Sequence, residues 1–335
     1  MSKEVLFSGI QPTGNLHIGN YLGAVKNWVK QQNSGKYNCY FCVADYHSLT
    51  GNMGPFERHK QILHTAAELL ALGIDPDKST FFIQSDVVEH TELAWIFNTV
   101  TPISELQRMT QFKDKSENQE KNVNAGLFTY PVLQAADILL YHGTVVPVGQ
   151  DQVQHVELTR DIARWFNNKY EKYFPETKVL LTEISKVMSL LEPTKKMSKS
   201  LGQNHVIELA DHPDMIEKKL KKAVTDSGEG KSPAAENLFL LLKNFAKKDI
   251  YNEFAAAQKQ RALQYGDLKK TLAEAITMYF EEFREKREAL LSEPKKLEEL
   301  LNVGAKKAKT AAKKNHERCK KIDWVEINVR FNKKV

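Results

Sequence analysis

Residues 5–23 read VLFSGIQPTGNLHIGNYLG, and this stretch decides the fold. It begins with a short apolar run that is typical of a buried strand. The glycine-interrupted turn after the run opens a helix at the carboxyl end of that strand, where α/β sheets bind their ligands. Gly9, Gly14 and Gly19 let a ligand approach the backbone closely, and the free N–H groups of a helix N-terminus favour phosphate. On spacing alone, a plain glycine turn with a capping asparagine stays open.

Two further apolar runs follow, YNCYFCVAD at residues 37–45 and TFFIQS at residues 80–85. Each is bounded by turn formers and predicts a buried strand. Between them, residues 56–73 have apolar side chains at helical spacing, and Gly73 stands where a helix would end. Strands that alternate with helices predict a parallel sheet with right-handed crossovers.

The pattern turns helical after residue 90, and strand character returns at residues 144–148, which read TVVPV. An amphipathic stretch at residues 151–167 follows this run. Residues 113–124 carry almost no apolar side chain and predict a surface loop. The sheet is therefore expected to resume after a helical insertion.

The chain reads mostly as helix from about Pro213 onward. One apolar stripe at helical spacing runs from Leu268 to Phe283, and Pro294 follows where that helix is expected to have ended. These features predict a second, α-helical domain.

Composition limits the class of protein. A chain of 335 residues and 38.3 kDa suggests about two domains, and 41% hydrophobic with 27% charged residues excludes disordered and fibrous classes. The net charge of +6 is mild for a nucleic-acid binder. Three cysteines cannot form a disulfide framework, which favours a reducing compartment. Because we find neither a signal-peptide core nor a membrane-spanning run, we expect a cytoplasmic protein without a membrane partner.

A second polar motif lies at residues 192–202, EPTKKMSKSLG. Three lysines and two serines occupy the six positions 195–200, in a segment too polar for a core. Lysine ammonium groups on such a loop suit a polyphosphate whose charge rises during transfer. Considered alone, this segment is more typical of a solvated basic loop.

Together the two motifs resemble the HIGH and KMSKS elements of the class I aminoacyl-tRNA synthetases. His17-Ile18-Gly19-Asn20 stands in place of HIGH, and residues 196–200 are KMSKS unaltered. Within that class, further segments look like those of the bacterial tryptophanyl-tRNA synthetases: residues 7–14, 108–113, 135–141, 146–152 and 223–227. The resemblance covers essentially the whole chain.

The resemblance implies a Rossmann-type catalytic domain at residues 1–205, with an insertion at about residues 90–135. It implies a helical anticodon-binding domain at residues 206–315, followed by a C-terminal tail at residues 316–335. It also implies a homodimer that binds ATP, L-tryptophan and tRNA(Trp).

The implied reaction has two steps. The tryptophan carboxylate attacks the α-phosphate of ATP and releases pyrophosphate, and the 3′ end of the tRNA then takes the tryptophanyl group and releases AMP. No side chain acts as a covalent nucleophile, so the protein aligns the reactants and stabilises charge on the phosphates, which Mg²⁺ bridges. The implied catalytic residues are Lys196, Lys199, Lys113 and Gln11. The implied ATP-binding residues are Gln11, Pro12, Thr13, Gly19, Asn20, Gly149, Gln150, Asp151, Val187, Lys196, Met197, Ser198, Lys199 and Ser200.

A tryptophan site needs apolar or aromatic walls and one acceptor for the indole N–H. Asp137 lies in a mostly apolar context, where an unpaired carboxylate would be costly, so a partner is expected. The residues alone leave a structural aspartate paired with a lysine, an arginine or a helix cap open, whereas the resemblance assigns Asp137 to the indole N–H. The implied tryptophan-binding residues are Asp137, Phe7, Gly9, Tyr130, Gln134, Val146, Val148 and Gln152. Because a glutamine three residues before an aspartate also occurs in tyrosyl-tRNA synthetases, tyrosine is the alternative substrate.

Two remaining patterns bear on metal and tRNA. Cys39 and Cys42 have C-x₂-C spacing, but no second pair accompanies them and residues three apart on a strand point to opposite faces, so we expect no protein-bound metal. Residues 306–321 carry eight basic side chains against Glu317 alone. This run is typical of a solvated helix face and equally of a surface that contacts tRNA phosphates.

Overall fold

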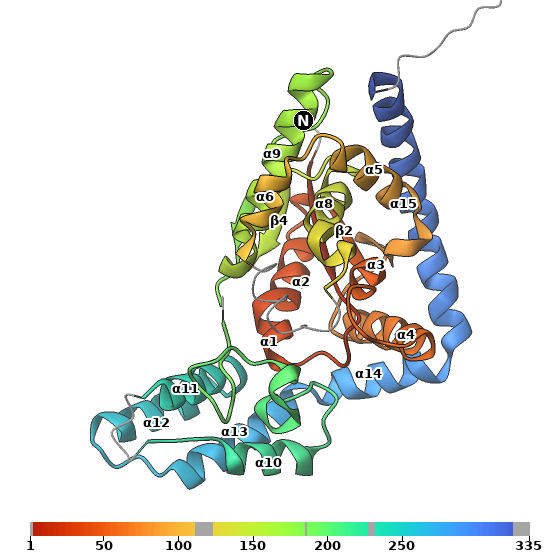
Figure 1. Ribbon diagram of the computed structural model, residues 1–335. Coiled ribbons are helices and arrows are strands. Elements are labelled where there is room, and N and C mark those ends of the chain that lie inside the picture. Colours follow the sequence, from red (N-terminus) through yellow and green to blue (C-terminus); the bar gives the residue numbers. More distant parts are fainter. Residues whose placement is uncertain (1–2, 111–122, 185, 227–231, 324–335) are drawn as a thin grey trace, which may run out of the picture.

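A five-stranded parallel sheet forms the centre of the molecule in the computed structural model (Figure 1), which describes residues 3–110, 123–184, 186–226 and 232–323. The strands are β1 (Glu4–Ile10), β2 (Tyr37–Val43), β3 (Ser79–Ile83), β4 (Val145–Val148) and β5 (Lys178–Leu181). Their spatial order is β3-β2-β1-β4-β5, and every pairing is parallel. This is the strand order of a Rossmann-type sheet, so the predicted fold class is confirmed. Sequence analysis missed β5, a partly exposed edge strand of four residues without a long apolar run.

Alternate side chains of the strands pack into two separate cores, one on each face of the sheet. Along β2, Cys39 and Phe41 belong to one buried cluster, and Tyr40 and Cys42 belong to the other. A parallel sheet that is covered on both faces explains why the strands read as continuous apolar runs. The expectation that Cys39 and Cys42 point to opposite faces is therefore confirmed.

Helices of the sheet domain cover these two faces. They are α1 (Ile18–Asn20), α2 (Lys26–Asn33), α3 (Asp45–Ser48), α4 (Pro55–Ala71), α5 (Glu89–Asn98), α6 (Ile103–Gln107), α8 (Ala125–Leu139) and α9 (Val153–Lys169). A π-helical turn, η1 (Tyr21–Val25), joins α1 to α2. The predicted helix at residues 56–73 is α4, and Gly73 after it has a φ of 106°, a conformation that glycine adopts without strain. The predicted helical insertion corresponds to α5, α6 and α8.

The second domain is helical, as predicted, and lies at one end of the sheet domain (Figure 1). Its helices are α10 (Pro213–Lys222), α11 (Pro233–Phe245), α12 (Lys248–Lys259), α13 (Tyr265–Tyr279) and α14 (Glu281–Ser292). The apolar stripe from Leu268 to Phe283 was expected on one helix. The helix is interrupted at Phe280, whose backbone leaves the helical conformation between α13 and α14. Pro294 begins another helix, because a proline fits the first turn of a helix as well as it fits the segment after an end.

That last helix, α15 (Pro294–Asp323), returns to the sheet domain and runs alongside it (Figure 1). Leu301, Ala305 and Ala308 form part of its buried stripe, and α15 packs against β3 and α5. The predicted boundary between residues 315 and 316 therefore falls inside one continuous helix. Residues 294–315 were predicted to belong to the helical domain; in the structure they lie on α15, whose small side chains let it pack against the sheet.

No helix in the described part of the chain combines the length and the apolar character that crossing a membrane requires.

Candidate active site

The two polar motifs meet at the turn between β1 and α1, although they lie 186 residues apart in sequence. Lys199 donates from Nζ to the carbonyl oxygens of Thr13 and Asn15, each at 2.9 Å. Gly14 lies between these two carbonyls with a φ of 105°. The backbone conformation therefore requires glycine, and a Cβ at residue 14, 2.9 Å from the Lys199 Nζ, would displace the end of that lysine.

His17 is buried beside this turn and lines the same cavity as Lys199. Its ring lies against Gly19, where a Cβ would approach the His17 Cε1 to 2.8 Å. Burial, followed by the charges of Lys199 and Lys196, lowers the pKa of His17 to about 3. The imidazole is therefore neutral at pH 7. Its buried Nδ1 has no hydrogen-bond partner among the described residues.

A cavity of about 440 Å³ lies at this junction. It is lined by Ile10, Gln11, Thr13, Gly14, Leu16, His17, Asn20, Ser198, Lys199 and Ser200. Polar groups, a cationic side chain and a helix N-terminus converge there. This combination suits a phosphate chain.

A second cavity, of about 350 Å³, lies at the carboxyl ends of β1 and β4. It brings together all eight residues predicted for tryptophan binding: Phe7, Gly9, Tyr130, Gln134, Asp137, Val146, Val148 and Gln152. Ile10 and Gln11 line both cavities, so the two share a border. Two small molecules bound in them would therefore be neighbours.

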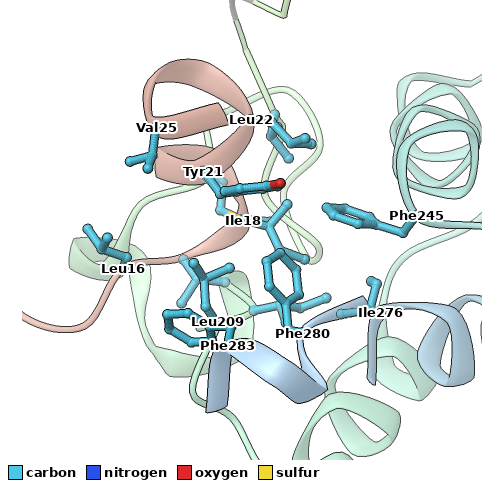
Figure 2. Packing of buried hydrophobic residues seen from close by; sticks show 14 of the residues in the cluster. Leu16, Ile18, Tyr21, Leu22, Val25, Leu209, Phe245, Ile276, Phe280 and Phe283 are labelled. Atoms are coloured by element: carbon cyan, nitrogen blue, oxygen red, sulfur yellow. The ribbon is translucent and has the colours of Figure 1, made fainter. Parts of the chain in front are cut away.

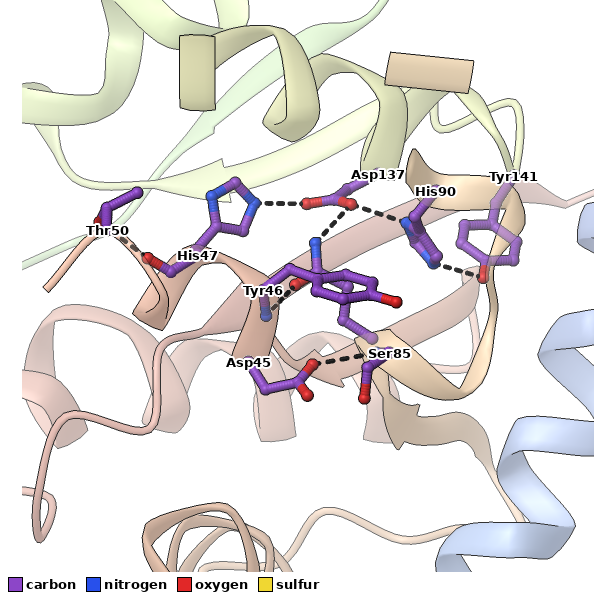
Figure 3. Close-up of polar contacts among 9 residues, drawn as sticks. Asp45, Tyr46, His47, Thr50, Ser85, His90, Asp137 and Tyr141 are labelled. Atoms are coloured by element: carbon purple, nitrogen blue, oxygen red, sulfur yellow. Dashed lines mark hydrogen bonds and ion pairs between the residues drawn. The ribbon is translucent and has the colours of Figure 1, made fainter. Parts of the chain in front are cut away.

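Among the described residues, Asp137 is the only one with a carboxylate that lines this second cavity. Its side chain is buried at the centre of a hydrogen-bond network (Figure 3). His47 donates from Nε2 to Oδ2 at 2.7 Å. Oδ1 accepts from Gln84 Nε2 at 2.7 Å and from His90 Nδ1 at 2.6 Å. Burial by itself would raise the pKa of Asp137, but the bonds and charges of the two histidines lower it to about 2. The carboxylate is therefore ionised and held in one orientation.

The partner expected for Asp137 thus exists, but it is a pair of histidines and an amide instead of a lysine, an arginine or a helix cap. Nδ1 of His90 donates to the carboxylate, and Nε2 of the same ring shares a hydrogen bond of 2.9 Å with the Tyr141 hydroxyl. His47 follows β2, and Gln84 and His90 follow β3. Their positions after the carboxyl ends of strands are the sequence signal that could have identified them.

The other predicted nucleotide residues surround the lysine loop. Lys196 forms an ion pair with Asp151 at 3.0 Å, and although burial raises the pKa of Asp151, the Lys196 charge and hydrogen bond lower it overall. Gly149 and Gln150 precede Asp151 in the turn after β4. Val187 accepts at its carbonyl from the Met197 N–H at 2.9 Å.

Three of the predicted residues, Val187, Met197 and Pro12, are buried. Ser198 and Ser200 share a hydrogen bond of 2.9 Å. Lys113 lies outside the described residues.

Comparison with known proteins agrees with this geometry. A family model described as tRNA synthetases class I (W and Y) matches residues 2–281, so the chain belongs to this class of enzymes. Its relatives include the tryptophan–tRNA ligase of Clostridium tetani, which is 45% identical over 97% of both chains. The tryptophan–tRNA ligase of Helicobacter pylori is 43% identical over 96% of this chain and 99% of its own. Within the class, the chain belongs to the tryptophan–tRNA ligases.

Solved structures that resemble this chain also include tryptophanyl-tRNA synthetases. A tryptophanyl-tRNA synthetase from Campylobacter jejuni, complexed with ADP and tryptophan, is 36% identical over 94% of this chain and 98% of its own, with a TM-score of 0.83. The tryptophanyl-tRNA synthetase from Mycoplasma pneumoniae is 33% identical over 96% and 97%, with a TM-score of 0.85. A tyrosyl-tRNA synthetase from Archaeoglobus fulgidus is 21% identical, which is a likeness of fold alone. Tryptophan is therefore favoured over the alternative, tyrosine, and the enzyme's reaction is ATP-dependent activation of tryptophan and its transfer to tRNA.

Proposed function

We propose that tryptophan occupies the cavity around Asp137 and that the ATP phosphates occupy the adjoining cavity around Lys199. The observation that carries this proposal is the shared border at Gln11, since a carboxylate in one cavity then lies next to a phosphate in the other. Such proximity is the main requirement of a reaction in which the nucleophile is already ionised.

In the first cavity, the indole N–H of tryptophan donates to Oδ2 of Asp137. That oxygen accepts one bond, from His47, whereas Oδ1 accepts two, so Oδ2 keeps acceptor capacity. Phe7, Val146 and Val148 supply apolar walls. Tyr130 and Gln134 line the same cavity and are the proposed contacts of the amino group.

In the second cavity, the turn at Thr13, the helix N-terminus at Asn20 and the lysine loop hold the nucleotide. Lys196 and Lys199 stabilise the charge that grows on the departing pyrophosphate, with Lys113 and Gln11 as further groups on the phosphates. The ribose lies at Gly149, Gln150 and Asp151, and the adenine lies at Val187. Mg²⁺ would be held by the phosphates of ATP, where it would help to neutralise their charge.

Replacing Lys199 with alanine tests this assignment. We expect adenylate formation, measured by ATP–pyrophosphate exchange, to slow by roughly 100-fold while the KM for tryptophan stays within about twofold, as for a contact made mainly in the transition state. Lys195→Ala is the matched control, because Lys195 is exposed and forms an ion pair with Glu192 outside the cavity. Equal losses in rate and in tryptophan affinity would exclude this role for Lys199. Exchange that is faster with tyrosine than with tryptophan would overturn the substrate.

We further propose that the enzyme works as a homodimer in the cytoplasm and that the helical domain, together with the basic face of α15, binds tRNA(Trp). Cys39, Cys42 and Cys319 are buried and form no disulfide among the described residues, which fits a reducing compartment. All eight basic side chains between residues 306 and 321 lie on the exposed face of α15, which is where phosphate contacts require them.

A further inference from the structure

A buried carboxylate on α4 touches the nucleotide turn and has no part in the proposed chemistry. Glu68 is 0% exposed. Its Oε2 accepts from the main-chain N–H of Leu16 at 2.7 Å, immediately before His17. Burying an ionised carboxylate is costly, so a compensating cation is required.

That cation comes from the helical domain. Arg287, on α14, donates from Nε to Oε1 of Glu68 at 2.9 Å. Its Nη2 lies 3.4 Å from Oδ1 of Asn15 and 3.3 Å from Nδ1 of His64. Asn15 in turn donates from Nδ2 to Oε2 of Glu208 at 2.9 Å. The backbone N–H of Leu16 and the side chain of Asn15 are thus both held by groups outside the turn.

The same turn holds Lys199. The Nζ of Lys199 binds the carbonyl oxygens of Thr13 and Asn15, so the position of Asn15 fixes one of the two acceptors of this lysine. The charge of Glu68 also acts on Lys199 and favours its protonated form, although burial lowers the pKa of Lys199 overall. An unbroken series of contacts therefore runs from Arg287 through Glu68 and the turn to Lys199.

We propose that Glu68 and Arg287 form a positioning pair, through which the helical domain sets the geometry of residues 13–17 and so places Lys199 for adenylate formation. This inference rests on the proposed role of Lys199. It adds two residues that do not touch the substrates, and it assigns the helical domain a part in the first chemical step as well as in tRNA binding.

A purely structural role explains this pair less well. The two domains are already joined by an apolar cluster, in which Tyr21 packs against Phe245 and Phe280 (Figure 2). A buried ion pair adds little net stability beyond such contacts, because desolvation offsets most of the attraction. The hydrogen bonds of the pair are directional, however, and directional contacts are what positioning of a turn requires.

The test is a double-mutant cycle between Arg287→Met and Lys199→Met, measured as kcat of ATP–pyrophosphate exchange by the full-length protein. Arg287→Met alone should lower kcat by roughly 10- to 100-fold, because small displacements of a phosphate-binding group cost rates of this order. The KM for tryptophan should stay within about twofold. In the Lys199→Met background, the same change should lower the residual rate by less than about threefold, since its effect passes through Lys199.

Ile162→Ala is the control for a general loss of stability, because Ile162 is fully buried on α9 among the residues of the opposite core. Equal losses of kcat from Arg287→Met in both backgrounds, or a loss no larger than that of Ile162→Ala, would overturn the proposal. If Arg287→Met does not fold, Arg287→Lys is measured in its place, because it keeps the charge but lacks the two-pronged geometry that reaches Glu68 and Asn15 together. A Lys199→Met protein with an undiminished rate would instead refute the role of Lys199 itself.

Discussion

At the scale of single residues, the site combines buried polar groups whose charge states are fixed by their neighbours. His17 is 7% exposed and is kept neutral by burial and by Lys199 and Lys196, while Asp137 is kept ionised by His47 and His90. Burial disfavours the charged form at both positions: at His17 it is the main cause of the lowered pKa, whereas at Asp137 the hydrogen bonds and charges of the two histidines outweigh it.

The depressed pKa of His17 makes stability depend on pH in a predictable direction. The unfolded chain takes up a proton at His17 below about pH 6.5, whereas the folded chain does so only near pH 3. The contribution of His17 is therefore fully present above pH 6.5 and is lost as the pH falls toward 3. Between pH 7 and pH 5 the free energy of unfolding should fall by roughly 2 kcal/mol more in the wild type than in His17→Asn. Urea titrations at the two pH values measure this difference, and equal losses would contradict it.

Some residues of the site could be predicted from the sequence, because their chemistry is visible in short segments. Gly14, Asn20 and Lys199 belong to motifs whose composition already suggests phosphate. Arg287 could not be predicted in the same way, since its partner Glu68 lies 219 residues away and is brought near by the folded chain. Spacing along the chain carries no information about such contacts.

At the scale of elements, the strands with two buried faces could be predicted, whereas β5 and the return of α15 to the sheet could not. The apolar run of β2 is visible because all its residues from Cys39 to Val43 are buried. The stripe on α15 is inconspicuous because it consists largely of alanine and glycine, which are small enough to let the helix approach β3 closely. Small residues give only a weak hydrophobic pattern in the sequence, even where they pack closely against a neighbouring element.

Gly304 is the point of closest approach between α15 and β3. A Cβ there would lie 1.7 Å from the main-chain oxygen of Phe81, an atom that cannot move without displacing the strand. Alanine gains about 1 kcal/mol of helix propensity over glycine, but overpacking costs about 1–3 kcal/mol and more where backbone is involved. Because the contact is with backbone, we take the upper end of this cost less the propensity gain, and we expect Gly304→Ala to lower the free energy of unfolding by at least about 2 kcal/mol.

The matched control for this prediction is Gly266→Ala on α13, where a Cβ would meet nothing within 4 Å. That change should be neutral or should stabilise by up to about 1 kcal/mol. Denaturant unfolding measures the free energy of unfolding of both variants. A Gly304→Ala protein as stable as Gly266→Ala would show that α15 does not pack tightly on the strand.

At the scale of the whole molecule, the proposed homodimer needs an apolar face, and Trp95 marks a candidate. Trp95 on α5 is 72% exposed, and it borders two cavities together with Thr91. Exposed tryptophans in such surroundings often dominate the affinity of an interface.

We expect Trp95→Glu to weaken the dimer by at least about 30-fold, because it removes an anchor and places a charge in the interface. Sedimentation over a range of concentrations should then detect 38.3 kDa monomers where the wild type is a dimer. Met278→Glu is the control, since Met278 is 71% exposed on α13 in the other domain. Equal dissociation of the two variants, or none, would exclude this face.

The proposed binding of tRNA involves residues of both domains. The dependence of tRNA affinity on basic side chains can be tested on α15. Lys313 and Lys314 are exposed on the outer face of this helix, and Lys313 lies 3.9 Å from Glu317, a distance typical of a weak ion pair. If both lysines contact tRNA phosphates, each releases about one counterion on binding. Replacing both with glutamine should then reduce the slope of log affinity against log salt by roughly 1.5 to 2. ATP–pyrophosphate exchange should stay unchanged, because neither lysine lies in the described cavities of the active site.

The control is Lys36→Gln, an exposed lysine in the turn before β2 that should leave the salt slope as it is. An unchanged slope in the Lys313 and Lys314 variant would show that these charges serve only to solvate α15. A reduced slope would show that the helix that packs its small residues on the sheet also presents its charged face to the tRNA. The sheet domain would then contribute to tRNA binding through α15, beside the helical domain.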